Sequence, residues 1–377
     1  MDGIRVGFRL SKRRGGRTRT VLFLEDDPAG TLDDHDLVDS GMTTPLLDVR
    51  GLRTVFRTDH GDFAAVDGVD FSVEAGRTLA IVGESGCGKS VTSLSIMGLL
   101  SSPGRIAGGS IRLEGRELVG LDDQPMRALR GTRMAMIFPE PMTSLNPAFT
   151  SGTQSVEALL CHRRIGGSDA RAAAIEALRQ VRMPDPERRF DEYPHRLSGG
   201  MRQRAMIAMA LVCSPRLLIA DEPTTALDVT IQAQILKLMG ELQRDTGTAI
   251  ILITHDLGVV AELADDVAVM YAGRVVERAP VGRLFAEPQH PYTVGLLGSM
   301  PRLEGAARRL ATIEGQVPGS HRRIAGCRFA DRCPFAVEDC RRRDPALLPV
   351  GGGDVGEHHA ACIRAPLDPD RLFGIAA

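Results

Sequence analysis

The stretch TLAIVGESGCGKSVTSLSIMGLL, from Thr78 to Leu100, decides the fold. Its opening TLAIV is an apolar run typical of a buried strand, and the residues after Ser90 have helical spacing. Between the two, Gly83 to Ser90 fit G-x-x-x-x-G-K-S, a pattern that binds nucleotide phosphates when a strand precedes it and a helix follows it. The stretch therefore predicts a strand, a phosphate-binding loop and a helix within an α/β sheet.

The residue types of this loop suit a phosphate group and a magnesium ion. Glycines at Gly83, Gly86 and Gly88 let backbone N–H groups turn toward phosphate oxygens. Lys89 can reach the β- and γ-phosphates, and the Ser90 hydroxyl can bind Mg²⁺ at the N-terminus of the helix. A Gly-rich turn without a ligand is the alternative interpretation, and the flanking strand and helix argue against it.

A second strand ends in two carboxylates. LLIADE, residues 217–222, is apolar up to Asp221 and Glu222, and in P-loop proteins such a strand lies beside the phosphate loop. We expect Asp221 to face the metal and Glu222 to orient the attacking water as a general base. An acidic pair alone is more often a simple strand end, so this prediction depends on the accompanying motifs.

Three further motifs support a nucleotide site. LSGGMRQR, residues 197–204, starts a helix with a serine hydroxyl and glycine N–H groups, which makes a second anion-binding helix N-terminus. ALD occupies residues 226–228. His255 follows the strand AIILIT, where the strand end would point it into the same cleft. A lone histidine there is more often structural, but together these motifs favour a functional role.

The motif order GESGCGKS, LSGGMRQR, LLIADEP, ALD and THD resembles the nucleotide-binding subunit of an ABC transporter over about residues 46–290. The resemblance implies a P-loop NTPase cassette of the α/β class, with a mixed-sheet core and a helical subdomain at about 140–210. We place this nucleotide-binding domain at residues 45–290. The pattern LLDVRGL and AAVDGVDFSV before the phosphate loop indicates further strands. Residues from about 118 to 189 are expected to be mostly helical.

The resemblance also implies site residues. Ser90 and Asp221 are expected to hold Mg²⁺, Glu222 to act as the catalytic base, and His255 to sense the γ-phosphate. Lys89 is expected to act on the phosphates with them. ATP is expected to contact Gly83, Glu84, Ser85, Gly86, Cys87, Gly88, Lys89, Ser90 and Val91.

The remaining nucleotide contacts come from two other places. Ser198, Gly199 and Gly200 are expected to cap ATP bound to the opposite subunit, so a single cassette cannot work alone. Asp228 of the ALD motif is also expected to contact nucleotide. An aromatic side chain stacks on adenine in such proteins. Phe56 is the first candidate and Phe63 the second, and core packing is the alternative for either.

One position departs from the family. Its members carry a glutamine that touches Mg²⁺ between the core and the helical insertion, whereas this chain reads MIFPEPMTSLNP with Pro139 at that position. Proline has neither a side-chain carbonyl nor an N–H, so it cannot perform the role of glutamine. Glu140 acting through water is one substitute for it. Without such a substitute, the proline indicates reduced coupling, a degenerate site or a sequencing error.

The C-terminal part, placed at 291–377, has a different composition. Cys327, Cys333, Cys340 and Cys362 are spaced C-x5-C-x6-C-x21-C, and four thiolates suit zinc or an iron–sulfur cluster. Zinc ligands usually occur as closely spaced pairs, and the wider spacing favours a cluster. Buried thiols without a ligand are the alternative interpretation. Cys87, Cys161 and Cys213 are expected to be structural.

A narrower resemblance covers the same part. HPYTVGLLGSMPR, IEGQVPG and GCRFADRCP, with MTSLNP earlier in the chain, are similar to the ATPase subunits of oligopeptide, dipeptide and nickel ABC importers. It implies a small cysteine-rich C-terminal module holding a [4Fe–4S] cluster on the four cysteines, with zinc as the alternative. The implied partners are two integral-membrane permeases, a second homologous ATPase and an extracytoplasmic substrate-binding protein. The cargo is expected to be a peptide, with nickel, glutathione or another small solute as alternatives.

Composition excludes several other classes. The chain has 377 residues, with 46 Lys plus Arg against 48 Asp plus Glu, so no overall positive field exists to hold nucleic acid. Its longest apolar run, AMIAMALVC, is shorter than the roughly 18 residues of a membrane span. The chain is therefore not expected to cross a membrane by itself, and the resemblance to importer ATPases implies a peripheral position on the cytoplasmic face of the membrane. A soluble ABC ATPase acting on DNA or ribosomes is the rival class, and the single compact cassette argues against it.

Residues 1–44 are charged, Gly-rich and without apolar periodicity. Such a composition predicts a disordered tail, because it offers too little apolar surface to offset the entropy of ordering. Met42 directly precedes the first expected strand, so a start codon assigned too early would account for this segment equally well.

Overall fold

The structure is a computed structural model that describes residues 6–12, 18–24, 44–59, 61–225, 227–300, 313–318, 324–350 and 358–367. The chain divides into two units, Met1–Thr43 and Thr44–Ala377. In the first unit, β1 (Val6–Lys12) pairs antiparallel with β2 (Thr18–Leu24). This hairpin differs from the disordered tail that we expected. The alternation of apolar and other residues in VGFRLSK favours a strand and accounts for the difference. Met42 lies outside the described residues.

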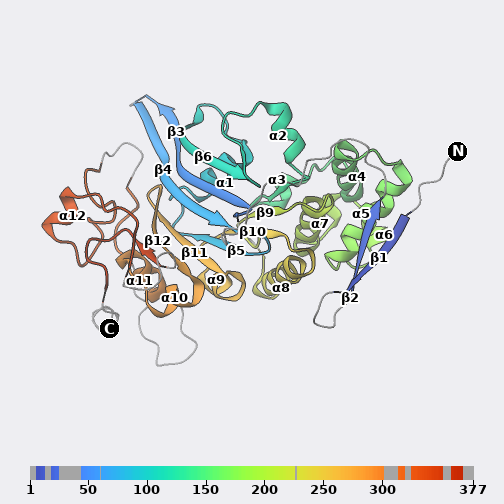
Figure 1. The fold of residues 1–377 in the computed structure, drawn as a ribbon. Helices are drawn as coiled ribbons and strands as arrows, with labels where there is room; N and C mark the ends of the chain where they lie inside the picture. Colours follow the sequence, from blue (N-terminus) through green and yellow to red (C-terminus); the bar gives the residue numbers. More distant parts are fainter. Residues whose placement is uncertain are drawn as a thin grey trace. The chain divides into compact units, whose positions relative to one another are not determined.

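An eight-stranded mixed sheet forms the centre of the described part of the second unit (Figure 1), in the order β13-β14-β12-β11-β5-β10-β9-β8. Strands β11, β5, β10, β9 and β8 run parallel, and β12, β14 and β13 continue the sheet antiparallel. The mixed-sheet prediction is confirmed. The bounds are β5 (Thr78–Val82), β8 (Met134–Ile137), β9 (Leu217–Asp221), β10 (Ala249–Thr254), β11 (Asp266–Tyr271), β12 (Arg274–Pro280), β13 (Leu348–Pro349) and β14 (His359–Ala360).

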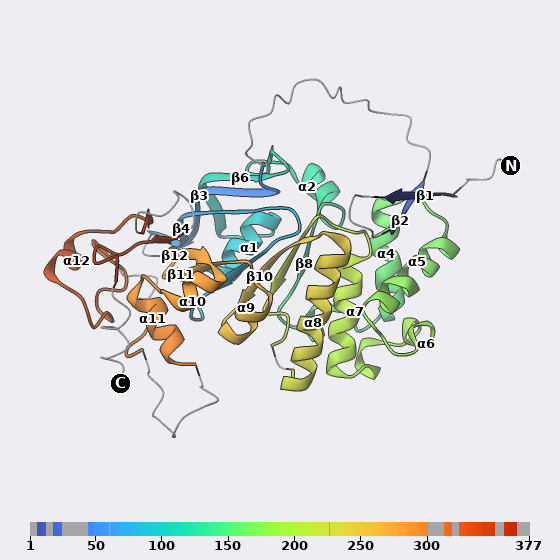
Figure 2. The same cartoon turned by 60° about the horizontal axis from the view of Figure 1, so that its bottom comes forward.

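A second, four-stranded antiparallel sheet has the order β4-β3-β6-β7. Its apolar face packs with α1 (Lys89–Met97) and the central sheet in one hydrophobic cluster, so α1 lies between the two sheets (Figure 2). Burial on two sides explains why this helix buries even its small polar residues Thr92, Ser93 and Ser95 together with Ile96 and Met97. The strands are β3 (Leu47–Thr58), β4 (Gly61–Val73), β6 (Gly104–Leu113) and β7 (Arg116–Glu117).

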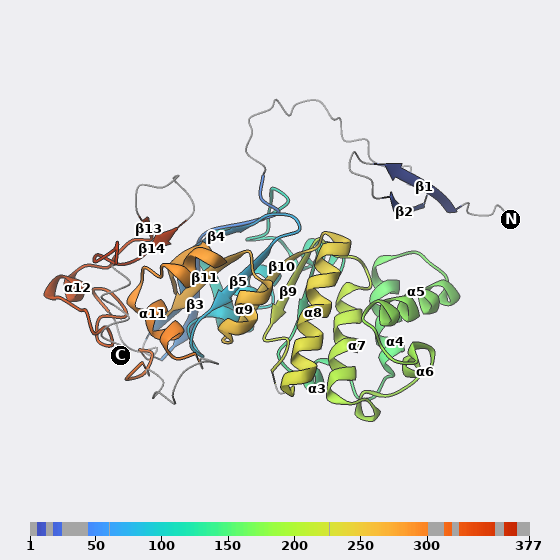
Figure 3. The same cartoon turned by 90° about the horizontal axis from the view of Figure 1, so that it is seen from below.

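The other face of the central sheet is covered by helices, with α7, α8 and α9 in neighbouring positions (Figure 3). A second hydrophobic cluster joins β8, β9 and β10 to these helices and to the helical insertion. The helices of the insertion and of this face are α2 (Asp123–Leu129), α3 (Pro141–Ser144), α4 (Ser151–His162), α5 (Gly167–Gln180), α6 (Pro186–Phe190), the 3₁₀ turn Pro194–Arg196, α7 (Gly199–Leu211), α8 (Val229–Thr246) and α9 (Leu257–Leu263).

Most of residues 118–189 are helical, as predicted, and strand β8 is the exception that the local pattern did not show. Its sequence MAMI is only four residues long and has no β-branched residue before Ile137. Methionine and alanine favour helices when they stand alone. Parallel pairing with β9, from Met134 opposite Leu217 to Ile137 opposite Ala220, overrides that local preference.

The C-terminal part is not a separate module, which corrects the expected fold class. Residues 44–377 form one compact unit, and β14 pairs with β12 through Ala360 opposite Glu277 and His359 opposite Arg278. A third hydrophobic cluster joins the strands β5, β11 and β12 to α10 (Val281–Ala286), α11 (Pro291–Gly298) and Phe329. The last helix is α12 (Glu338–Arg342). Shared strands and a shared core thus make this part an extension of the cassette.

A buried carboxylate secures the junction. Glu277 on β12 is 0% exposed and accepts hydrogen bonds from the backbone N–H groups of Gln289 at 2.6 Å and His290 at 2.8 Å. Its Oε1 also lies 2.8 Å from Nε2 of His358, next to β14. One side chain therefore ties together β12, the start of α11 and the C-terminal strand.

Candidate functional site

The phosphate-loop sequence lies between β5 and α1, as predicted. Gly83 has φ +152°, and a Cβ there would lie 2.2 Å from the Met270 carbonyl oxygen. Gly88 has φ +108°, and a Cβ there would lie 2.5 Å from the Ala65 carbonyl oxygen. These approaches explain why glycine is needed at both positions. Lys89 is 5% exposed, and its Nζ donates to the carbonyl oxygens of Gly83 at 2.7 Å and Glu84 at 3.1 Å.

Other loop residues divide by exposure. Ser85, Gly86 and Ser90 are exposed, Glu84 and Val91 are half-buried, and Cys87 is buried. Burial raises the pKa of the Cys87 thiol, which keeps it protonated and inert. The structural role expected for this cysteine agrees with that position.

The Ser90 and Asp221 pair fits a magnesium ion. Asp221 ends β9, is 2% exposed, and is hydrogen-bonded to Ser90. Burial raises the pKa of its carboxyl group, while the Ser90 bond and the nearby Lys89 lower it. Among the described residues, its Oδ1 has no hydrogen-bond partner. A buried, unpaired carboxylate oxygen beside a hydroxyl is a suitable donor set for Mg²⁺ bound with substrate phosphates.

Glu222 and His255 lie in contact at the ends of adjacent strands. His255 Nδ1 is 3.4 Å from Glu222 Oε1, and Thr225 Oγ1 donates to Glu222 Oε2 at 2.9 Å. Glu222 has φ +47°, a left-handed conformation that is uncommon outside glycine and is often found at functional sites. Its backbone N–H donates to Ile253 O at 2.9 Å, which holds this conformation. Glu222 thus stands next in the chain to Asp221, the candidate metal ligand at the end of β9.

The LSGG and ALD residues form a second set. The Ser198 hydroxyl caps α7 by accepting from Met201 N at 3.3 Å, and Asp228 caps α8 by accepting from Ile231 N at 3.0 Å. The two caps are close, because a Cβ on Gly200 would lie 2.8 Å from Ile231 Cγ2. No hydrogen bond between described residues joins this set to the phosphate loop, and in Figures 1 and 2 α7 lies away from α1.

Two further predictions concern aromatic and metal contacts. Phe56 on β3 and Phe63 on β4 are paired directly opposite each other, and both are half-buried. The two candidates for stacking on adenine are therefore neighbours in the sheet. The stacking role stays a prediction. Phe138 and then Pro139 follow β8, which pairs in parallel with β9, the strand that ends at Asp221. The proline therefore lies at the same edge of the sheet as the candidate metal ligand Asp221, and its departure from the family stands.

Comparison with known proteins identifies the family. Residues 66–225 match the ABC transporter family, and residues 276–340 match the oligopeptide/dipeptide transporter C-terminal region. A probable peptide ABC transporter ATP-binding protein of Sinorhizobium fredii is 55% identical over 85% of this chain and 95% of its own length. The oligopeptide transport ATP-binding protein AppD of Bacillus subtilis is also 55% identical, over 80% of this chain and 93% of its own. The chain belongs to the ABC transporter ATP-binding proteins.

Solved structures agree with the cassette fold. The dimeric bacterial ABC transporter cassette MJ0796 aligns with a TM-score of 0.57 at 25% identity, over 62% of this chain and 98% of its own. The protein cbiO1 of Clostridium perfringens, part of the ABC transporter complex cbiONQ, aligns at 0.55 and 28% identity, over 64% of this chain and 91% of its own. This ABC ATPase therefore has the predicted cassette fold.

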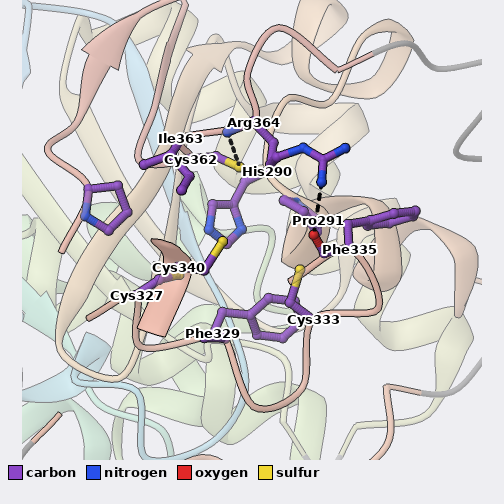
Figure 4. Close-up of a pocket in the computed structure, with 12 residues that line it drawn as sticks. His290, Pro291, Cys327, Phe329, Cys333, Phe335, Cys340, Cys362, Ile363 and Arg364 are labelled. Carbon is purple, nitrogen blue, oxygen red and sulfur yellow. Dashed lines mark hydrogen bonds between the residues drawn. The ribbon is translucent and has the colours of Figure 1, made fainter. Parts of the chain in front are cut away.

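The four C-terminal cysteines of this ABC ATPase line one small cavity (Figure 4) of about 20 Å³. They come from the turn at 327–333, from α12 and from the segment after β14, and all are free thiols. Burial raises the pKa of Cys333 to about 12 and raises those of Cys327 and Cys362. The residues that the structure describes contain no group of three or more His, Cys, Asp or Glu arranged to hold a metal ion. The geometry of the described residues therefore supports neither zinc nor a cluster, and four soft thiols are a donor set that either could use.

Sequence reasoning missed the contacts that the C-terminal part makes with the phosphate loop. Tyr292 Oη accepts a hydrogen bond from the backbone N–H of Glu84 at 2.8 Å. Arg332 Nη1 lies 3.0 and 3.1 Å from the two carboxylate oxygens of Glu84. Burial raises the pKa of Tyr292, so it stays a neutral hydroxyl. Both residues lie inside quoted motifs, HPYTVG and GCRFADRCP, but no local pattern relates them to a loop more than two hundred residues earlier.

Proposed function

We propose that this chain is the ATP-hydrolysing subunit of an ABC importer for di- or oligopeptides. The observation that carries this proposal is the pair of family matches on one chain, cassette at 66–225 and oligopeptide/dipeptide C-terminal region at 276–340. The relatives at 55% identity are named for peptide or oligopeptide transport. Nickel, glutathione or another small solute is the alternative cargo, since substrate selection lies in other subunits.

The chemistry proposed at the site is in-line attack of water on the γ-phosphate. Gly83 to Ser90 hold the phosphates, with the buried Lys89 ammonium neutralising their charge. Mg²⁺ held by Ser90 and Asp221 would polarise the phosphoryl oxygens. Glu222 accepts the proton of the attacking water and His255, 3.4 Å away, fixes the orientation of that carboxylate.

The second set of residues requires a second subunit. Because Ser198, Gly199, Gly200 and Asp228 share no hydrogen bond with the described phosphate-loop residues, we propose that they act on ATP bound by a homologous ATPase. ATP then stabilises the closed dimer, and hydrolysis releases it. Two permeases would convert this motion into transport, with an extracytoplasmic binding protein delivering the peptide.

The described residues include no helix long and apolar enough to span a bilayer. We therefore propose a peripheral position on the cytoplasmic face, held by the permeases. We place the nucleotide-binding domain at 45–290, with its helical subdomain at about 140–210, and the extension at 291–377. A soluble ABC ATPase acting on DNA or ribosomes is the rival, and the match to the transporter C-terminal region disfavours it.

The test is ATPase activity of the chain reconstituted with its permeases and partner ATPase, with and without peptide-loaded binding protein. We expect peptide to stimulate hydrolysis, and Lys89→Ala or Glu222→Gln to abolish it. Comparing native Pro139 with Pro139→Gln in the same assay measures what the missing glutamine contributes. Undiminished hydrolysis in the Glu222 variant would remove the proposed base, and activity unaffected by the binding protein would remove the importer assignment.

We also propose that Cys327, Cys333, Cys340 and Cys362 hold a [4Fe–4S] cluster with a structural role. The support is their convergence on one cavity and the softness of four thiol donors. Anaerobically purified protein should contain iron and sulfide and show the absorption of such a cluster. Stoichiometric zinc without iron would overturn the assignment.

A further inference from the structure

Glu84, which follows the first glycine of the phosphate loop, is held on three sides. Its backbone N–H donates to Tyr292 Oη at 2.8 Å, and its carboxylate lies 3.0 Å and 3.1 Å from Arg332 Nη1. Its carbonyl oxygen accepts from Lys89 Nζ at 3.1 Å. The N–H and the carboxylate are thus tied to the C-terminal extension, and the carbonyl to the lysine that must meet the phosphates.

Arg332 is itself fixed in place. Its side chain is 6% exposed, and its other nitrogens donate to the Glu314 carbonyl at 2.9 Å and the Ile313 carbonyl at 3.2 Å. The guanidinium carbon lies 5.7 Å from the ring centre of Tyr271. A planar guanidinium whose nitrogens are all hydrogen-bonded holds a carboxylate in one orientation. A flexible lysine side chain in its place would not.

The surrounding aromatic side chains make this support rigid. Tyr271, Tyr292 and Phe329 are buried and pack together, with ring centres 4.7 Å apart for the two tyrosines and 5.2 Å for Tyr271 and Phe329. They come from β11, α11 and the segment before Cys333. The wall behind Glu84 is therefore a packed core contributed by both the cassette and the extension.

We propose that Arg332 is a positioning residue for the phosphate-binding loop, so that the C-terminal extension forms part of the ATP site. This inference rests on the proposed function, in which the loop binds ATP. Arg332 holds Glu84, and Glu84 and Gly83 hold the Lys89 ammonium through their carbonyl oxygens. Loss of Arg332 lets this part of the loop move, which weakens phosphate binding while the groups at Glu222 remain in place.

The experiment measures ATP binding to the purified full-length chain with a fluorescent ATP analogue, and kcat and KM for ATP in the reconstituted complex. Arg332→Ala should raise the Kd for ATP about tenfold, because it removes a charge-assisted, largely buried contact. It should change kcat by less than about threefold, since the groups at Glu222 are untouched. Arg332→Lys keeps the charge and should recover part of the affinity.

Two further variants keep the inference testable. Arg341→Ala removes an exposed ion pair with Asp331 in the same extension, and it should leave ATP affinity unchanged. Tyr292→Phe keeps the ring and removes only the hydroxyl that accepts from Glu84 N, so it should weaken ATP binding even if Arg332→Ala fails to fold. Wild-type affinity in a folded Arg332→Ala variant, or in Tyr292→Phe where Arg332→Ala does not fold, would overturn the inference. Failure of the wild-type chain to bind ATP would instead overturn the proposed function.

Discussion

Glu277 offers a prediction whose size can be worked out from its contacts. Replacing Glu277 with alanine removes the acceptor of two buried backbone N–H groups, at Gln289 and His290, and the partner of the buried His358. Each buried donor left unpaired costs about 1–3 kcal/mol, and breaking a buried paired charge costs about 3–5 kcal/mol. Because the contributions overlap, we expect the free energy of unfolding to fall by about 3–5 kcal/mol, a large part of the about 5–15 kcal/mol of a typical domain.

The assay combines urea unfolding, followed by circular dichroism, with hydrogen exchange of the peptide spanning 286–298. Glu277→Ala should lower the urea midpoint and release the protected amides of Gln289 and His290. Glu287→Ala is the matched control, because its exposed carboxylate lies 4.0 Å from Arg283 and should contribute less than about 1 kcal/mol. Unchanged amide protection in the Glu277 variant would refute the reasoning that this carboxylate secures the junction.

Three other predictions concern the site and the cysteines. Glu222→Gln should slow ATP hydrolysis by roughly 10²–10⁴-fold while leaving ATP binding intact, measured by phosphate release and nucleotide binding; equal losses in both would contradict a base role. Gly88→Ala should abolish ATP binding, because its Cβ would lie 2.5 Å from the Ala65 carbonyl oxygen; a variant that binds ATP normally would contradict the tight packing there. In the metal-free chain, iodoacetamide at pH 8 should modify exposed Cys161 before Cys333, whose thiol has a pKa raised to about 12 and therefore stays protonated until much higher pH. Faster labelling of Cys333 in mass spectra would contradict its burial.

Local patterns were enough to predict the phosphate loop and the strands and helices beside it. Gly83 to Ser90 lie between β5 and α1, as predicted. The predicted strand LLIADE corresponds to β9, which ends at Asp221. In each case the apolar run and its turn residues carry the information within a few positions. The helix that begins at LSGG was predicted in the same way and is α7, whereas the cap that Asp228 provides for α8 was not predicted.

Features that depend on distant pairing were missed. Strand β8 exists because Met134 to Ile137 pair with β9, and Ile137 alone within MAMI favours a strand. The same limit applies to Arg332, whose partner Glu84 is 248 positions away. Cysteine spacing did predict that four thiols meet, but the shared strands β12 and β14, which prevent a separate module, leave no signal in composition.

The pairing of β14 with β12 bears on how the chain folds during synthesis. Until residues 359 and 360 have left the ribosome, β12 presents a free edge whose backbone groups can recruit another unfinished chain. The segment made last therefore covers part of the edge of β12, in a sheet whose first strand, β5, was made nearly three hundred residues earlier. For the same reason, a fragment ending at residue 290 should aggregate rather than behave as an independent cassette, and a nascent chain would need protection until its end emerges.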